Sequence, residues 1–267
     1  MGKGKLAKFA DMETYGNVFQ YPYSVVSDVP FSMCGHWREE YFKNQNPIVL
    51  ELGCGKGEYT VGLARRHPEM NFIGVDIKGA RMWTGATMAL REGLPNVAFL
   101  RTNIEIIDRF FGPDEVQELW LTFSDPQMKN PRKRLTSTWF LNRYRHFLTD
   151  GGIVHLKTDS RFLHEYARAV CAVNKLRVLS CTQDLYNQQV EVQPVVREVQ
   201  TFYEQLFLEQ GYPITYLSFV IDHEGPFVSP RDPEEFDSKA WRAAEGPRLL
   251  FGHDSAETRR QKLHGEL

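Results

Sequence analysis

Cysteine is scarce in this 267-residue chain, and histidine is not spaced to bind a metal ion. No C-x-x-C pair and no H-x-H or H-x-x-x-H spacing occurs; the four cysteines are Cys34, Cys54, Cys171 and Cys181. Zinc sites normally draw their ligands from such close pairs. The sequence therefore predicts no metal site, and the scattered cysteines favour a reducing compartment.

Long apolar segments are also lacking. No run approaches the roughly 18 apolar residues of a membrane-spanning helix, and the stretch MGKGKLAKFADMETYG has no apolar segment of the signal-peptide kind. We therefore expect no membrane partner and a soluble protein of the cytoplasm.

An overall excess of positive charge is absent as well. The chain has 32 Lys and Arg against 34 Asp and Glu, for a net charge of -2. The protein as a whole is therefore no polycation, and a nucleic-acid surface has to be a local patch. The basic stretch 129–145 is the candidate.

What is present indicates one globular domain with additions, since 42% of the residues are hydrophobic. Residues 1–45 show no clean period and are expected to form an N-terminal arm leading into a short helix. Residues 46–221 are expected to form the main domain. Residues 222–267 are charged, rich in Pro and Gly, and expected to form a surface extension.

Within the main domain, short apolar runs alternate with stretches of helical spacing. The expected strands are 47–53, 71–76, 97–102, 117–123, 152–158 and, after a polar stretch at 182–213, 213–221; the expected helices are 58–68, 78–93, 104–112, 134–148 and 160–173. Repeated β-α units of this kind predict an α/β fold, a doubly wound and mainly parallel sheet with helices on both faces.

The first expected strand ends in the glycine-rich turn ELGCGKG, from Glu51 to Gly57. Glycines in this position, here Gly53 and Gly55, let the backbone approach a ligand at the carboxyl edge of the sheet. The spacing is not that of a dinucleotide fold, and the Ser or Thr of a phosphate-binding P-loop is missing after Lys56. A purely structural turn is the alternative.

Asp76 closes the second expected strand, about twenty residues after the glycines, where an acid can bind both hydroxyls of a ribose. NAD and S-adenosylmethionine both contain such a ribose. Glu51 favours S-adenosylmethionine, because a carboxylate there can bind the ammonium of its amino-acid end but would repel a pyrophosphate.

The run FSDPQMKNPRKR follows the fourth expected strand, so Asp125 is expected at the sheet edge beside the cofactor. A simple helix cap is the alternative. The cations after it are expected to bind an RNA backbone, although some of them can equally form a solvated face. They are Arg132, Lys133 and Arg134, with Lys129 before them and Arg143, Arg145 and His146 on the following helix.

Four segments in this order resemble the bacterial tRNA (guanine-N7)-methyltransferase family. They are ELGCGKGEYTVGLARRHPEMNFIGVDIKGARM, SDPQMKNPRKRL, LKTDSRFLHEYA and VQTFYEQ, and the likeness covers roughly residues 45–221. The resemblance implies a seven-stranded class I methyltransferase sheet of the Rossmann-like type. It also implies S-adenosylmethionine as cofactor, tRNA as partner and guanosine 46 of the variable loop as the methylated nucleoside; monomer and homodimer stay equally open.

The resemblance also assigns residues. It implies that Glu51 and Asp76 bind the cofactor, that Asn103 lies near its adenine, and that Asp125 is the active-site aspartate. Substrate contacts are implied for Lys129, Asp159, Thr201, Phe202, Tyr203 and Glu204. The chain departs from the family in having Asn103 where aspartate is common and Gln127 where tryptophan is common.

Local structure offers alternatives for several of these residues. Asp159 can cap the helix expected from Ser160, and Thr201 with Glu204 has the spacing of a capping box. Three tryptophans, Trp83, Trp120 and Trp139, are expected to pack in the core rather than to stack on bases.

The chemistry expected of Asp125 follows from guanine. N7 already has an in-plane lone pair, so methyl transfer to it requires no general base. Asp125 is therefore expected to hold the base, accepting from N1–H and N2–H, and to offset the positive charge that develops on the purine. Two alternatives are a small-molecule methyltransferase and a non-catalytic RNA-binding module on the same fold.

Overall fold

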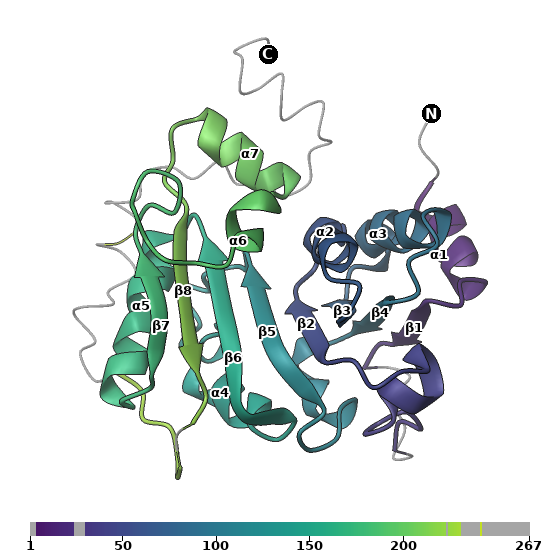
Figure 1. Ribbon diagram of the computed structural model, residues 1–267, viewed down its shortest axis with the longest axis horizontal. Coiled ribbons are helices and arrows are strands. Elements are labelled where there is room, and N and C mark those ends of the chain that lie inside the picture. The colour runs from purple at the N-terminus through teal and green to yellow at the C-terminus, as the bar shows by residue number, and fades with distance from the viewer. Residues whose placement is uncertain (1–3, 24–29, 223, 231–240, 242–267) are drawn as a thin grey trace. The chain divides into compact units, whose positions relative to one another are not determined.

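The computed structural model describes residues 4–23, 30–222, 224–230 and 241. Their centre is one mainly parallel sheet in the order β1-β4-β3-β2-β5-β6-β8-β7 (Figure 1). The strands are β1 (Val18–Tyr21), β2 (Ile48–Leu52), β3 (Asn71–Asp76), β4 (Val97–Thr102), β5 (Val116–Thr122), β6 (Leu148–Thr158), β7 (Val178–Thr182) and β8 (Thr215–Val220). This arrangement confirms the predicted doubly wound sheet.

The strand order reverses between β2 and β5. From β2 the chain proceeds outwards to β3 and β4, and it then returns to place β5 on the other side of β2, with β6 beyond it. All these pairs are parallel, whereas β8 is antiparallel to both β6 and β7. In sheets of this kind the ligand crevice lies at the carboxyl ends of the strands at the reversal point.

Helices cover both faces of the sheet. The α-helices are α1 (Lys5–Glu13), α2 (Glu58–Arg66), α3 (Gly79–Arg91), α4 (Thr138–Tyr144), α5 (Arg161–Val173), α6 (Val195–Glu198) and α7 (Phe202–Glu209); Ile104–Arg109 and Pro131–Lys133 are 3-10 helices, and Arg38–Phe42 is a π-helix. Apolar residues of α2, α3 and α6 share a core with one face of the sheet, including Trp120 and Phe99. Figure 1 shows α4 and α5 behind β6 and β7.

The amino-terminal residues correct one prediction. The expected arm contains α1, which packs on α3, and β1, which pairs in parallel with β4 as an eighth strand. The short helix expected after the arm corresponds to the π-helix Arg38–Phe42. The side chain of Trp37 is fully buried, and its Nε1 donates to the carbonyl of Phe110 at 2.8 Å. The sheet therefore has eight strands rather than the seven implied by the family.

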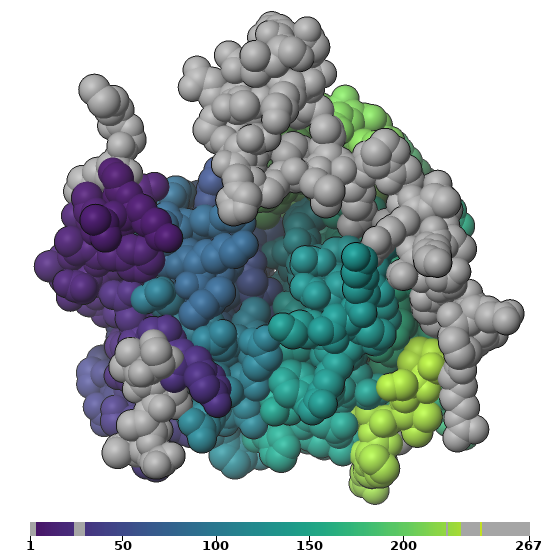
Figure 2. All heavy atoms as spheres, turned by 180° about the vertical axis from the view of Figure 1, so that it is seen from behind, coloured from purple at the N-terminus to yellow at the C-terminus, as the bar shows by residue number. Residues whose placement is uncertain are grey.

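The polar stretch 182–213 contains α6 and α7, which the sequence pattern did not predict. Of the predicted extension 222–267, most residues lie outside the described part of the chain. Residues 224–230 are described, and there Val228 exchanges two hydrogen bonds with the side chain of Asn174. Seen from behind, these yellow-green residues lie beside the teal and green middle of the chain (Figure 2). No helix among the described residues is long and apolar enough to cross a membrane.

Candidate active site

The glycine-rich turn joins β2 to α2 with a backbone that requires glycine. Gly53, Gly55 and Gly57 have φ angles of 83°, 55° and 72°, in the left-handed region. A Cβ added to Gly53 would meet no atom within 4 Å, whereas one on Gly57 would lie 2.6 Å from the Phe99 ring. The first glycines therefore leave open space for a ligand, and Gly57 serves the packing of helix on strand.

Asp76, the last residue of β3, stands directly over this turn. Its Oδ2 accepts from the Gly55 N–H at 2.9 Å, and its Oδ1 accepts from the Lys78 N–H at 2.7 Å. These bonds fix the carboxylate, which is partly exposed and keeps a further lone pair on each oxygen. The geometry suits a ligand with two neighbouring hydroxyl groups.

Glu51 lies deeper, near the end of β2, with only 3% of its surface exposed. One oxygen accepts from the backbone N–H of Thr60 at 2.8 Å and from its hydroxyl, and the other accepts from the hydroxyl of Thr122. Burial raises the pKa of the Glu51 carboxyl to about 7, although these hydrogen bonds oppose the rise. A bound cation would favour the ionised form, so the site fits an ammonium group.

Asn103 follows β4 at the same edge. Its side-chain Oδ1 accepts from the backbone N–H of Tyr23, at 3.2 Å, because β1 runs parallel to β4 and ends beside it. The amide NH₂ of Asn103 therefore remains the group that can donate to a ligand. Tyr23, whose side chain is 68% exposed, is a site neighbour that the sequence did not reveal, since β1 was not predicted.

Together these residues match the order of groups in S-adenosylmethionine. Asn103, Asp76 and Glu51 follow or end the adjacent strands β4, β3 and β2. An elongated ligand across these strand ends would meet a donor for a heterocycle, an acceptor for ribose hydroxyls and an acceptor for an ammonium in turn. The residues present therefore fit this cofactor.

Asp125 lies in the loop after β5, across the reversal point from Glu51. The carboxylate is exposed, and its Oδ1 accepts from the N–H of Gln127 at 2.9 Å. Gln127 has a φ of 46°, so the loop bends sharply behind the acid. The neighbouring Ser124 has a buried hydroxyl that finds no hydrogen-bond partner among the described residues.

Arg134 corrects a prediction, because it is only 1% exposed and cannot bind a phosphate in this structure. Its guanidinium donates to the carbonyls of Pro126 and Met128 at 3.2 and 3.3 Å. It also lies 4.6 and 4.3 Å from the ring centroids of Phe162 and Tyr166. Burial lowers the pKa of Arg134, and the residue holds the Asp125 loop from inside.

The other cations of the run differ in exposure. Lys129, Arg132 and Lys133 are exposed, the last two on the 3-10 helix. Arg143 lies 3.5 Å above the ring of Trp139 and donates to the carbonyl of Glu105. The positive patch beside Asp125 is therefore smaller than the sequence predicted.

The three tryptophans also differ in exposure and in contacts. Trp120 is 2% exposed and stacks on His155, which confirms packing. Trp83 is half-buried and donates to Asp11 at 2.8 Å. Trp139 is not a core residue, because its ring is partly exposed, and the guanidinium groups of Arg132 and Arg143 lie 5.2 and 3.5 Å from its centroid.

The two capping alternatives have different outcomes. Helix α5 is capped by Ser160, whose side chain accepts from the Leu163 N–H, so Asp159 is not the N-cap residue. Thr201 and Glu204 do form a capping box at the start of α7. Asp159 is partly exposed, and its contact with substrate stays a prediction.

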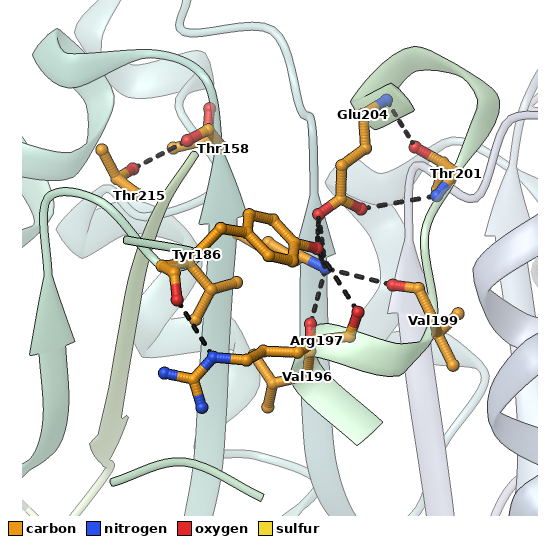
Figure 3. A network of polar contacts seen from close by, with 10 residues as sticks. Thr158, Tyr186, Val196, Arg197, Val199, Thr201, Glu204 and Thr215 are labelled. Atoms are coloured by element: carbon orange, nitrogen blue, oxygen red, sulfur yellow. Dashed lines mark hydrogen bonds and ion pairs between the residues drawn. The ribbon is translucent and has the colours of Figure 1, made fainter. Parts of the chain in front are cut away.

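Glu204 corrects a further prediction. The residue is 0% exposed, and its carboxylate forms an ion pair with Lys157 at 2.7 Å (Figure 3). Direct substrate contact by Glu204 is therefore wrong in this structure. Phe202 and Tyr203 beside it are partly exposed.

Comparison with known proteins agrees with this fold. Residues 45–217 match a family described as putative methyltransferase. The solved 16S rRNA methyltransferase KamB aligns with a TM-score of 0.53 at 17% identity, covering 68% of this chain and 91% of that one. A solved antibiotic-related methyltransferase aligns with a TM-score of 0.51 at 14% identity, covering 74% and 97%. The likeness to these two solved structures concerns the fold, and the fold and the family match together define a class I methyltransferase.

Sequence relatives narrow the class. A tRNA (guanine-N(7)-)-methyltransferase of Bacteroides fragilis is 58% identical over 238 residues, covering 89% of this chain and 94% of its own. Its counterparts of Porphyromonas gingivalis and Brevibacillus brevis are 51% and 34% identical, covering 87% and 73% of this chain and 95% and 89% of theirs. The chain belongs to the tRNA (guanine-N7)-methyltransferase family.

Proposed function

We propose that this protein transfers the methyl group of S-adenosylmethionine to N7 of guanine 46 in the variable loop of tRNA. One observation carries the proposal: an exposed carboxylate, Asp125, stands across the strand reversal from the buried Glu51. A methyl donor bound along β4, β3 and β2 would end beside this acid. The names of the relatives support tRNA guanine as the acceptor.

The chain's own residues would hold the cofactor from both sides of the glycine turn. Glu51 would accept from the ammonium, Asp76 from the ribose hydroxyls, and Asn103 would donate to the adenine ring. The open space over Gly53 would admit the ligand close to the backbone. When bound, the cofactor supplies an electrophilic methyl group on a sulfonium.

Asp125 would orient the acceptor base. The N7 lone pair needs no deprotonation, so the carboxylate is free to accept from guanine N1–H and N2–H and to balance the charge that arises on the purine. The N–H of Gln127 and the guanidinium beneath the loop fix its position. The base has to leave its contacts within the tRNA to reach this position.

The exposed cations beside Asp125 would bind the tRNA backbone. Lys129, Arg132 and Lys133 lie within eight residues of the acid and reach solvent. Phosphate contacts of this kind orient a nucleic acid and make its binding depend on salt.

The test is a methylation assay on unmodified tRNA, followed by borohydride reduction and aniline cleavage to map N7-methylguanine. We expect a cleavage product at position 46, and none when guanine 46 is replaced by adenine. Methyl incorporation into tRNA without that product would contradict the proposal, as would incorporation into small molecules only.

A further inference from the structure

Lys157 is the most deeply buried cation near the site, and nothing assigned so far uses it. The residue lies in β6, and its side chain is 0% exposed. Its Nζ contacts the Glu204 carboxylate at 2.7 Å and donates to the carbonyls of Val196 and Val199, at 2.6 and 3.1 Å. The Lys157 ammonium therefore connects the sheet to α6, to the residues after it and to α7.

The Glu204 carboxylate also accepts hydrogen bonds from groups other than Lys157. The hydroxyl of Tyr186 donates to it at 2.6 Å, and the backbone N–H of Thr201 donates at 3.4 Å within the capping box. In Figure 3, dashed lines join Glu204 and the carbonyls of Val196 and Val199 to one nitrogen, which is the Nζ of Lys157. The pair therefore has its polar atoms satisfied inside the protein.

A buried ion pair adds little net stability to a fold, because both charges lose their hydration. Burial lowers the pKa of Lys157 and raises the pKa of Glu204, while their mutual attraction opposes both shifts. Replacing a buried ion pair by apolar side chains is often neutral or stabilising, so the pair adds a defined geometry more than it adds stability. That geometry matters for α6 and α7, because helices of four and eight residues are too short to hold themselves in place.

The start of α7 rests on the cofactor turn. The N–H of Phe202 donates to Glu58 at 3.1 Å, and the ammonium of Lys56 lies 4.7 Å from the Phe202 ring centroid. Glu58 begins α2, and Thr60 in the same turn donates to Glu51. The segment 201–204 and the proposed cofactor site therefore share the first turn of α2.

We infer that Lys157 is a positioning residue for the tRNA substrate: through Glu204 and the two carbonyls it holds segment 201–204 against the glycine turn. Phe202 and Tyr203 are then the members of the segment that reach the surface. The inference rests on the proposed function. It replaces direct substrate contact by Glu204 with an indirect role.

The experiment compares Lys157→Met, Glu204→Gln and the double variant. Kinetics on tRNA give KM and kcat, calorimetry gives the dissociation constant for S-adenosylmethionine, and hydrogen exchange reports on residues 195–209. We expect Lys157→Met to raise the KM for tRNA about tenfold or more, with cofactor affinity within about threefold of the parent. Exchange in 195–209 should rise at least about tenfold.

The double variant separates positioning from simple stabilisation. It removes both buried charges, so its melting temperature should recover towards that of the parent. Its KM should stay raised, because the anchors to Val196 and Val199 are still missing. Recovery of KM together with melting temperature would overturn the inference.

Glu118→Gln is the matched control, because it removes the negative charge from the pair of Glu118 and His155, 3.1 Å apart, on β5 and β6 of the same sheet. It should change stability without raising the KM for tRNA; a rise equal to that of Lys157→Met would overturn the inference. If Lys157→Met does not fold, Tyr186→Phe removes one donor to Glu204. Raised KM with faster exchange in 195–209 then supports the inference, and parental values of both contradict it.

Failure of the proposed function can be distinguished from failure of the inference about Lys157. A parent protein that does not methylate tRNA would contradict that function, whereas hydrogen exchange in 195–209 tests the anchoring by Lys157 without any turnover. Slow parental exchange that Lys157→Met leaves unchanged would overturn the anchoring on its own.

Discussion

Arg134 lies beneath the loop that presents Asp125, with its Nε 3.2 Å from the carbonyl oxygen of Pro126, the next residue after the acid. A second nitrogen reaches the carbonyl of Met128. A buried guanidinium thus fixes both ends of the bend behind the exposed carboxylate.

Replacing Arg134 should therefore damage both fold and catalysis. Arg134→Met loses two charge-assisted hydrogen bonds, and we expect the free energy of unfolding to fall by about 2 kcal/mol or more. The value of kcat/KM should fall about tenfold or more, because Asp125 is no longer held in place. Denaturant titration and kinetics measure the two effects. Lys133→Met, on the exposed side, is the control for stability, and an equal loss there would contradict this assignment.

Glu51 should make the stability of the cofactor-free protein depend on pH. Its pKa is about 7 in the fold against an ordinary value of 4.5. Its contribution is therefore fully present below about pH 4.5 and is lost as the pH rises through about 7, by an amount on the order of 1 to 3 kcal/mol. Melting temperatures of parent and Glu51→Gln between pH 5 and 8 provide the test. The parent should lose stability relative to the variant, and parallel profiles would contradict the shift.

Asp76→Ala should weaken S-adenosylmethionine binding by about 1 to 3 kcal/mol, since charge-assisted partners of the ribose are lost. Calorimetry on the purified protein measures this directly. Asp150→Ala, an exposed aspartate in β6, should leave the affinity unchanged. Parental affinity in Asp76→Ala would mean that the ribose does not bind there.

The residues of the basic run have two different expected roles, because Arg132 and Lys133 are exposed whereas Arg134 is buried. The double substitution Arg132→Ala and Lys133→Ala should weaken tRNA binding. It should also reduce the slope of the logarithm of the binding constant against the logarithm of the salt concentration, by up to about one per lost phosphate contact. Cofactor affinity should not change. A titration over several salt concentrations is sufficient, and an unchanged slope would show that these residues only face water.

The comparison of sequence and structure shows where local pattern is informative. The strands that contain Glu51 and Asp76, and the strand that precedes Asp125, are predicted within a few residues, because buried parallel strands appear as apolar runs between turns. Strand β1 was missed, since its four residues gain their place only by pairing with β4, far along the chain.

The side-chain environments were harder to predict. Arg134 is indistinguishable in the sequence from its neighbour Lys133, and only the packing of Phe162 and Tyr166 shows that it points inwards. Glu204 could be recognised as part of a capping box, but its partner Lys157 lies on a distant strand. Contacts between distant segments decide both cases, and one sequence does not display them.

Asp125 itself should be required for orientation rather than for proton transfer. Asp125→Asn turns an NH₂ towards the guanine donors and removes the negative charge, so kcat/KM should fall about 100-fold or more with cofactor binding nearly intact. The shape of the pH-rate profile should be the same in parent and variant. Loss of an acidic limb in the variant would instead indicate a general base.

The most direct measurement is kcat/KM of the parent and of Asp125→Asn on two tRNAs, one with guanosine and one with inosine at position 46. Inosine retains N7 and N1–H but lacks the 2-amino group that Asp125 is proposed to bind. We predict that the parent methylates the inosine tRNA more slowly than the guanosine tRNA, and that the advantage of Asp over Asn shrinks on inosine. Equal rates of the parent on both tRNAs, with an equal loss in Asp125→Asn, would contradict the contact with the amino group.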